Sequence, residues 1–297
     1  MSHRQVHRPL AGIAYAAAAM ALMSGQDAIL KWLTGGYATM QILVVRALVV
    51  FAIAWFVLQR EGGFRELATE RPVGHGIRCV LNVVTVWLFV TAVARLPLAD
   101  VMAIVMASPL FTLALSTLIL KEVVGVRRWS ACAVGFVGVL IMLRPTGGAF
   151  NLGGAAAISA AVTYSLMMIQ TRRLTATEGN GALMFYAAAT VLVVSGLTAP
   201  AVWVEPAPFD VMLMLAAGLI TGIGHFCFVQ GYRFASPTVL APIDYTALLW
   251  GVLLGWLIWQ ELPDGPTTLG AVIVTCSGLY IIRREAFLAG RSKAVPT

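Results

Sequence analysis

The sequence predicts an all-α polytopic membrane protein with ten transmembrane helices, arranged as two inverted five-helix repeats. Composition, the spacing of apolar runs and the placement of Lys and Arg support this prediction. Of the 297 residues, 60% are hydrophobic and 11% are charged, whereas soluble domains average about 45–50% apolar and about 25% charged residues. The mean hydropathy is +0.87. This composition excludes a soluble enzyme, and it excludes a disordered chain, which would be poor in hydrophobic residues.

The first half of the chain holds five apolar runs, each bounded by charged or turn residues. They predict helices at 10–33, 38–58, 73–94, 97–120 and 126–144, and each run is long enough to cross a bilayer. The run Val101–Leu120 has none of the alternation that a membrane β-barrel needs. Pro72 and Pro97 stand where helices begin, and Pro109 lies inside a span and predicts a kink.

The second half holds five more runs, which predict helices at 152–173, 180–203, 210–232, 237–259 and 266–283. Pro237 and Pro266 stand at helix starts, and Pro242 predicts a second kink. Ten spans of about 20 residues leave roughly 100 residues for connections, which is too few for a separate soluble domain. The short basic segment Met1–Arg8 precedes a run long enough to remain as a span, so no cleavable signal is expected.

The basic residues predict the orientation. With the N-terminus in the cytoplasm, fifteen Lys and Arg residues fall on the inner side, and only Lys31, Arg95 and Arg144 fall on the outer side. This asymmetry follows the positive-inside rule and requires an even number of spans. We therefore expect a multi-pass protein of a bacterial-type cytoplasmic (inner) membrane, with both termini cytoplasmic. The net charge of +7 is then an orientation signal, and no nucleic-acid partner is expected.

The chain contains an internal repeat, in which segment 94–145 matches segment 233–284. Glu122 corresponds to Glu261 and Gly138 to Gly278, and earlier the stretch from Gly12 to Lys31 corresponds to that from Gly154 to Arg173. The predicted repeats are residues 1–145 and 146–297, five helices each. Because five is odd, the second repeat enters the membrane inverted. Inverted repeats are typical of secondary transporters, which bind substrate near the midplane and work by alternating access.

These features together resemble the EamA-type branch of the drug/metabolite transporter (DMT) superfamily over residues 10–284. The matching motifs are Ser24-Gly25-Gln26 with Lys31, Arg46, Pro109 with Leu120-Lys121-Glu122, and Trp259-Gln260-Glu261. The resemblance implies export of amino acids or other small metabolites, although some members import them. The aromatic amino acid exporters are a plausible closest group.

Charged and polar residues inside the spans are candidates for function, because a charge at the bilayer centre costs about 2.5–3.5 kcal/mol on insertion scales. Arg46 lies in mid-span, and Asp27 is the preferred partner for an intramembrane charge pair, with Asp100 second. The pair would either anchor a substrate carboxylate or serve as a permanent structural link. Further substrate-binding candidates are polar or aromatic residues placed deep in the third, sixth, eighth and ninth spans: Asn82, Trp87, Tyr164, His225, Phe226, Asp244 and Tyr245.

The preferred function is a secondary transporter that exports small amphipathic metabolites, with aromatic or other apolar amino acids as the first expectation. An intramembrane enzyme and an importer of the same fold are the alternatives. No paired catalytic motif or nucleotide-binding motif is present, so the chain is not expected to be an enzyme or a primary pump. Cys79, Cys132, Cys227 and Cys276 form no CxxC or Cys/His cluster, so no metal or other cofactor is expected. The expected partners are the lipid bilayer and the solute, with a monomer or weak homodimer as the assembly.

Overall fold

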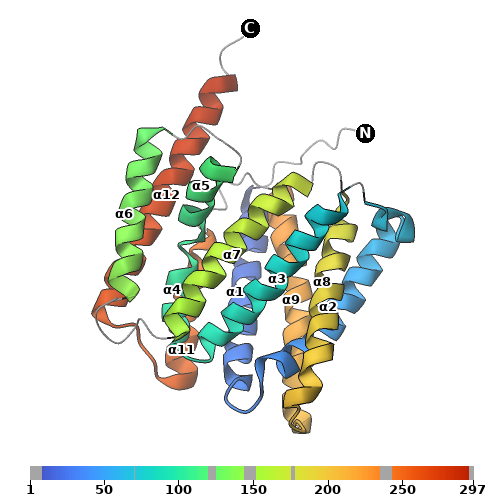
Figure 1. Ribbon diagram of the computed structural model, residues 1–297. Coiled ribbons are helices and arrows are strands. Elements are labelled where there is room, and N and C mark those ends of the chain that lie inside the picture. The colour runs from blue at the N-terminus through green and yellow to red at the C-terminus, as the bar shows by residue number, and fades with distance from the viewer. Residues whose placement is uncertain are drawn as a thin grey trace. The chain divides into compact units, whose positions relative to one another are not determined.

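The computed structural model describes residues 9–69, 71–119, 125–143, 152–174, 178–234 and 243–293, and within these ranges it is built from helices (Figure 1). Among these described residues, seven helices are long and apolar enough to cross a membrane, and three shorter apolar helices lie at Trp129–Leu143, Thr246–Trp259 and Gly265–Ile281. Together they match the ten predicted spans, and the predicted fold class is confirmed. A helix satisfies its own backbone hydrogen bonds, which hydrocarbon cannot do.

The elements follow the chain in this order: α1 (Pro9–Leu33), α2 (Thr39–Glu61), η1 (Gly63–Leu67), α3 (Pro72–Val93), α4 (Leu98–Val105), α5 (Ser108–Ile119), α6 (Val126–Leu143), α7 (Leu152–Leu174), α8 (Asn180–Thr198), η2 (Ala199–Val202), α9 (Pro208–Phe234), α11 (Thr246–Trp259) and α12 (Gly265–Lys293). The 3₁₀-helix η1 lies in the long connection between the second and third spans.

The fourth span is interrupted, as Pro109 predicts. Helix α4 ends at Val105 and α5 begins at Ser108. A proline at position 109 cannot donate to the carbonyl of Val105, which lies four residues earlier. The hydroxyl of Ser108 donates to that carbonyl at 2.5 Å instead, so the polar group freed by the proline is satisfied within the break.

Other predicted features differ from the structure or lie outside it. Helix α12 runs to Lys293, ten residues beyond the predicted end of the last span at 283. Four of its residues are charged, so the apolar run marks where hydrocarbon ends and not where the helix ends. The predicted kink at Pro242 and the repeat residue Glu122 lie outside the described residues.

The chain divides into two compact units that do not follow the halves of the sequence. Unit 1 contains residues 1–25, 97–150 and 223–297, and unit 2 contains residues 26–96 and 151–222. In unit 2, α3 packs against α7 and α2 against α8, as Figure 1 shows. In unit 1, α12 packs along α6, and α11 contacts α4. Each unit therefore joins helices from both predicted repeats.

Each unit has its own buried core. In unit 2, a cluster of fully buried side chains joins the end of α1 to α2, α3 and α9: Leu30, Leu33, Ile42, Leu43, Val90 and Met214. In unit 1, Ala19, Met20 and Ala247 are buried among Met23, Met106 and other apolar side chains. Many large apolar residues are nevertheless exposed, including Leu118 at 75% and Leu197 at 78%, which fits helices that face lipid on their outer sides.

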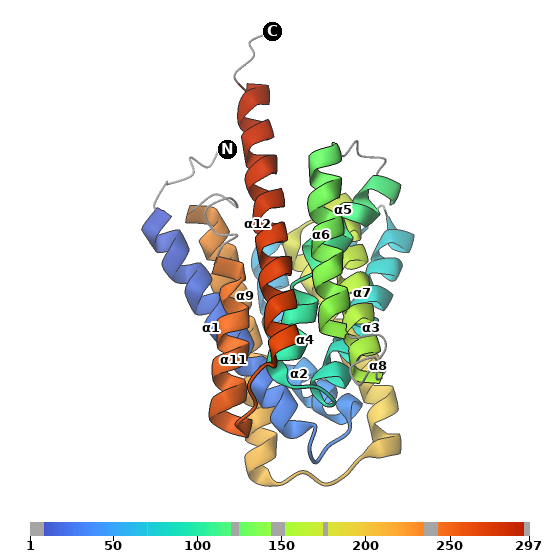
Figure 2. The same cartoon turned by 90° about the vertical axis from the view of Figure 1, so that its left-hand side faces the viewer.

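In unit 1, the two helices α6 and α12 approach closely at two glycines (Figure 2). A Cβ atom on Gly270 would lie 2.5 Å from the backbone oxygen of Gly138, and a Cβ on Gly138 would lie 2.9 Å from the backbone oxygen of Gly270. Beside this crossing, the hydroxyl of Ser277 donates to the carbonyl of Ala131. Small residues permit such contacts between membrane helices, where dispersion and hydrogen bonds must hold the pair together.

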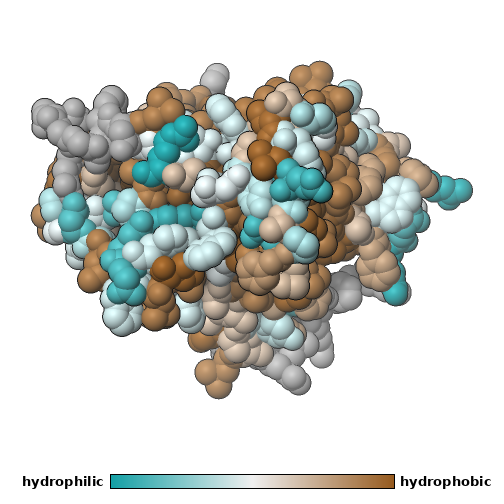
Figure 3. All heavy atoms as spheres, turned by 90° about the horizontal axis from the view of Figure 1, so that it is seen from below, coloured by the Kyte–Doolittle hydropathy of each residue, from teal (hydrophilic) through white to brown (hydrophobic). Residues whose placement is uncertain are grey.

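The start of α1 and the end of α12 lie at the same end of unit 1 in Figures 1 and 2, as an even number of crossings requires. Figure 3 views the opposite end of the molecule, where hydrophilic side chains gather among hydrophobic ones.

The positive-inside orientation gives a direct prediction. A topology reporter fused after Arg173 or Arg284 is expected to be cytoplasmic, because these positions end basic inner segments. A reporter inserted at 205–208 is expected to be external. A cytoplasmic signal at 205–208 would contradict both the ten-span order and the inverted repeat.

Candidate functional site

Arg46 lies at the centre of a polar cluster in unit 2. Its Nη2 donates to Oε1 of Gln26 at 3.1 Å, and its Nε donates to Oγ1 of Thr221 at 3.3 Å. The Thr221 hydroxyl lies 2.7 Å from Oε1 of Gln26 and 2.7 Å from the carbonyl of Ala217, both acceptors. Gln26 and Thr221 are buried, at 5% and 4% exposure. The guanidinium of α2 is thus held by side chains from α1 and α9.

Close approach of α2 and α9 positions this cluster. A Cβ on Gly218 would lie 2.7 Å from the backbone oxygen of Arg46 and 2.8 Å from Cβ of Val49. One turn later, a Cβ on Gly222 would collide with the side chain of Ile53. Two glycines four residues apart lie on the same face of a helix. This face of α9 therefore has no side chains at these positions, and the close approach to α2 brings Thr221 within reach of the guanidinium.

The predicted pair, Asp27 and Arg46, is linked through the neighbouring amide of Gln26. Nε2 of Gln26 donates to Oδ1 of Asp27 at 2.8 Å, while Oε1 of the same amide accepts from Arg46. Among the described residues, Nη1 of Arg46 and Oδ2 of Asp27 have no hydrogen-bond partner, and neither atom is fully buried. The cluster therefore keeps one guanidinium donor and one carboxyl oxygen for a further ligand.

Gln26 is part of a sequence motif, and neither it nor Thr221 is among the predicted substrate-binding residues. A glutamine next to Asp27, in a span that faces Arg46, was the available signal. The geometry could not be predicted, because it depends on the glycines that bring α9 against α2.

The other predicted residues of unit 2 lie on α3 and α7. Nδ2 of Asn82 donates to the carbonyl of Ala187 on α8 at 3.5 Å, a long hydrogen bond. Trp87 is 44% exposed and Tyr164 is 40% exposed. In the same two helices, the hydroxyl of Thr85 donates to that of Thr163 at 2.9 Å, which adds a polar link to the pair.

The remaining predicted residues belong to unit 1. His225 and Phe226 are exposed on α9, Phe226 at 58%. Asp244 is partly buried. Tyr245 is buried at 8% exposure, and its hydroxyl lies against Gly278 of α12, where a Cβ would collide with it. The two groups of predicted residues thus belong to different units.

The prediction that Asn82, His225 and Asp244 face water remains to be tested by cysteine accessibility. Asn82→Cys, His225→Cys and Asp244→Cys are expected to react with a water-soluble thiol reagent, because polar groups in a span are costly unless they face water or a partner. Substrate should protect them. The background replaces the native cysteines, which are Cys79, Cys132, Cys227 and Cys276.

Control cysteines belong in uninterrupted apolar runs. Phe51→Cys and Leu192→Cys are expected to stay unreactive, because their runs offer no polar path. If the three test cysteines are as inert as these two, the proposed water access is wrong.

A second polar cluster in unit 2 lies at the predicted inner end. Nε2 of His75 lies 3.3 Å from Oε2 of Glu178, with both side chains buried, and the Thr69 hydroxyl donates to Oε1 of Glu178 at 2.6 Å. Arg78 is held by two hydrogen bonds. Its Nε donates to Thr171 and its Nη1 to the carbonyl of Leu183, both at 2.8 Å. These contacts fasten α3 to α7 and α8.

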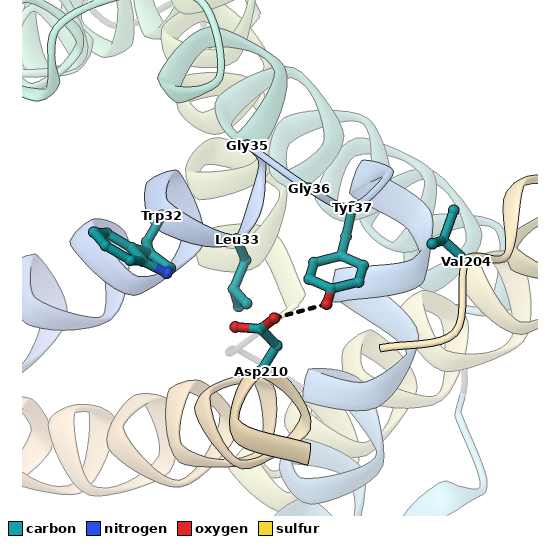
Figure 4. A pocket seen from close by; sticks show the side chains of 7 residues that line it. All are labelled: Trp32, Leu33, Gly35, Gly36, Tyr37, Val204 and Asp210. Atoms are coloured by element: carbon teal, nitrogen blue, oxygen red, sulfur yellow. Dashed lines mark hydrogen bonds between the residues drawn. The ribbon is translucent and has the colours of Figure 1, made fainter. Parts of the chain in front are cut away.

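The predicted outer end of unit 2 is fastened by Gln41 and Tyr37. The Gln41 amide donates to the carbonyl of Val204 at 2.5 Å and accepts from the N–H of Val204 at 3.0 Å. The Tyr37 hydroxyl donates to Oδ2 of Asp210 at 2.6 Å and accepts from the N–H of Ala207 at 3.1 Å. An open pocket lies beside Tyr37 and Asp210 (Figure 4).

Comparison with known proteins finds a transporter family and relatives that are named as transporters. Residues 10–144 and 151–283 each match the EamA-like transporter family. A riboflavin transporter of Vibrio cholerae is 30% identical over 84% of this chain and 86% of its own length. An S-adenosylmethionine uptake transporter of Rickettsia prowazekii is 31% identical over 75% of this chain and 76% of its own.

The fold is also found in a solved crystal structure of a protein that covers 93% of this chain and 98% of its own. It has a TM-score of 0.64 and 18% sequence identity, so it bears on the fold alone. The two family matches cover almost the whole chain, one in each half, and the helices are those of a multi-pass membrane protein. This chain therefore belongs to the EamA-like transporter family within the drug/metabolite transporter superfamily, and it is a secondary transporter.

Proposed function

We propose that this protein exports small metabolites that carry an α-amino carboxylate and an apolar or aromatic part, with amino acids as the simplest members. The observation that carries the proposal is the cluster of Arg46, Gln26 and Asp27. It holds a guanidinium and a carboxylate close together, joined by an amide.

The charges in this cluster suit a zwitterion. Arginine binds carboxylates through paired N–H donors, and Nη1 of Arg46 is left for such an acceptor. The unengaged Oδ2 of Asp27 would accept from a solute ammonium. The intervening Gln26 amide bonds to one atom of each group, so each group is held in place without being used up by the other. A direct ion pair would leave less capacity for a solute.

The relatives' names support a solute with a ring and a polar end. Riboflavin and S-adenosylmethionine each join a flat heterocycle to a polar chain, and S-adenosylmethionine ends in an α-amino carboxylate. Exposed aromatic side chains such as Trp87 and Tyr164 would suit the ring of such a solute. Export follows the family resemblance, whereas the relative named for uptake makes import the alternative direction.

Counterflow in proteoliposomes tests the solute class. Proteoliposomes that contain the purified protein would be loaded with unlabelled tryptophan. Entry of labelled tryptophan, phenylalanine, S-adenosylmethionine and riboflavin into these vesicles would then be measured. The matched probes are phenylpropionate, which lacks the ammonium, and phenethylamine, which lacks the carboxylate. Exchange of the α-amino carboxylates, with at least tenfold less exchange of either matched probe, is the expected result.

Two outcomes would overturn the proposal. Exchange of riboflavin without any α-amino carboxylate would remove the zwitterion from the recognised chemistry. Chemical conversion of a solute without exchange would favour the intramembrane enzyme. Direction is measured separately in intact cells: resistance to toxic amino acid analogues supports export, and sensitisation to them supports import.

A further inference from the structure

The pocket at the predicted outer end of unit 2 offers a second binding chemistry, which goes beyond the proposed solute site. It has a volume of about 330 Å³ and is lined by Trp32, Leu33, Gly35, Gly36, Tyr37, Val204 and Asp210. In Figure 4 the Asp210 carboxylate lies between the rings of Trp32 and Tyr37. A cavity of this size is at the lower end of the range for small-molecule sites.

The turn after α1 shapes the pocket, and its backbone N–H groups are already engaged in hydrogen bonds within the turn. The N–H of Gly35 donates to the carbonyl of Trp32, and the N–H of Gly36 donates to the carbonyl of Leu33. Across the pocket, the N–H groups of Val204 and Ala207 donate to Gln41 and Tyr37. These backbone donors are therefore not available to an anion.

In contrast to these engaged donors, the pocket keeps a hydrogen-bond acceptor without a partner among the described residues. Oδ2 of Asp210 accepts from Tyr37, while Oδ1 has no hydrogen-bond partner within the part of the chain that the structure describes. Figure 4 shows this second oxygen turned away from Tyr37, toward the side of the pocket where Trp32 lies. The hydrogen bond to Asp210 raises the pKa of Tyr37, so the phenol stays protonated and holds the carboxylate in place.

Trp32 adds an aromatic face. It is 53% exposed although it lies in the last turn of α1, whereas the next residue, Leu33, is 1% exposed. Indole is the best aromatic partner for a cation, and Lys, Arg and quaternary ammonium groups bind over such rings. The pocket thus offers a carboxylate oxygen without a partner in the described part of the chain and an exposed indole ring, while its backbone N–H groups are already hydrogen-bonded. This combination disfavours anions and favours organic cations.

We propose that this pocket binds an organic ammonium group, with Asp210 as counter-ion and Trp32 as the aromatic wall. The ammonium has two natural sources: an amine-bearing solute at the outer mouth of the transporter, or the choline headgroup of a lipid. Both present the same chemistry to the pocket.

The test uses the full chain purified in maltoside micelles, with tetramethylammonium chloride as the probe at constant ionic strength. Binding would be titrated by saturation-transfer NMR, which requires no transport, so failure of the proposed solute class leaves this test intact. Saturable binding is expected. Asp210→Asn and Trp32→Leu are each expected to raise the Kd about tenfold, a change of about 1.4 kcal/mol.

Glu205→Gln is the matched control. Glu205 is an exposed acid in the connection between η2 and α9, and its side chain does not line the pocket. This substitution should leave the Kd within twofold. Helix content and elution volume would confirm that each variant is folded. Absence of saturable binding, an unchanged Kd in Asp210→Asn, or an equal effect of Glu205→Gln would overturn the proposal.

The source of the ammonium is resolved by repeating the titration in nanodiscs. If the natural occupant is a headgroup, phosphatidylcholine will compete with tetramethylammonium and phosphatidylglycerol will not. If the two lipids give the same Kd, the occupant is a soluble amine. Either result supports the ammonium site, provided that Asp210→Asn weakens binding in the same discs.

Discussion

Replacing Arg46 with alanine is expected to lower exchange of α-amino carboxylates about a hundredfold. The change removes the N–H donors to Gln26 and Thr221, and it leaves the nearby Asp27 carboxyl without a cation. Removing one partner of a buried charged network costs about 3–5 kcal/mol, and about 2.8 kcal/mol corresponds to a hundredfold change. Counterflow rates and the melting temperature of the purified protein would be measured together.

The pattern of loss separates the two roles of Arg46. If the melting temperature falls with all transport, the cluster is a structural link between α1, α2 and α9. If the protein stays folded and loss is confined to solutes with a carboxylate, Arg46 anchors the substrate. Arg46→Lys keeps the charge without the planar fork, so it should restore part of the stability and little of the exchange. Arg95→Ala, in a predicted outer connection, is the control, and full exchange by Arg46→Ala would contradict both roles.

Substituting Gly270 with alanine is expected to destabilise unit 1 by about 1–3 kcal/mol, the usual cost of overpacking. A methyl group at this position would lie 2.5 Å from the backbone oxygen of Gly138 and would collide with the Met142 side chain. The backbone oxygen cannot move without separating α6 from α12. A lower melting temperature and lower yield of folded protein in detergent are the readouts.

Gly76→Ala in α3 provides the opposite expectation. Nothing lies within 4 Å of a Cβ at that glycine, and alanine favours a helix by about 0.5–1 kcal/mol over glycine. The control should therefore be neutral or slightly stabilising. Equal melting temperatures for the two variants would show that the α6–α12 crossing tolerates a wider separation.

The sequence was sufficient for the helices and their order, because hydrocarbon permits few alternatives to a helix of about 20 apolar residues. It also predicted the break at Pro109, since a missing N–H is a local property. It placed the end of α12 ten residues too early, because hydropathy reports the edge of the bilayer and not the end of hydrogen bonding.

The site was predicted less completely. Arg46 and Asp27 are visible in the sequence because charges are rare inside spans, but Gln26 and Thr221 are ordinary polar residues until α1, α2 and α9 are packed together. The Gln41–Val204 and His75–Glu178 contacts join residues more than 100 positions apart. Such pairings depend on which helices become neighbours, and helical periodicity carries no information about that.

The interleaving of the two units has a consequence for how the protein is made. Helices α2 and α3 leave the ribosome long before α7 and α8, which are their packing partners in unit 2. Helix α6 likewise waits for α12, the last helix to be synthesised. During translation the first half must therefore stay in the membrane with its eventual interfaces, including the Arg46 guanidinium, covered by lipid, water or the insertion machinery. Neither unit can close until the second half has followed, so assembly is completed only near the end of synthesis.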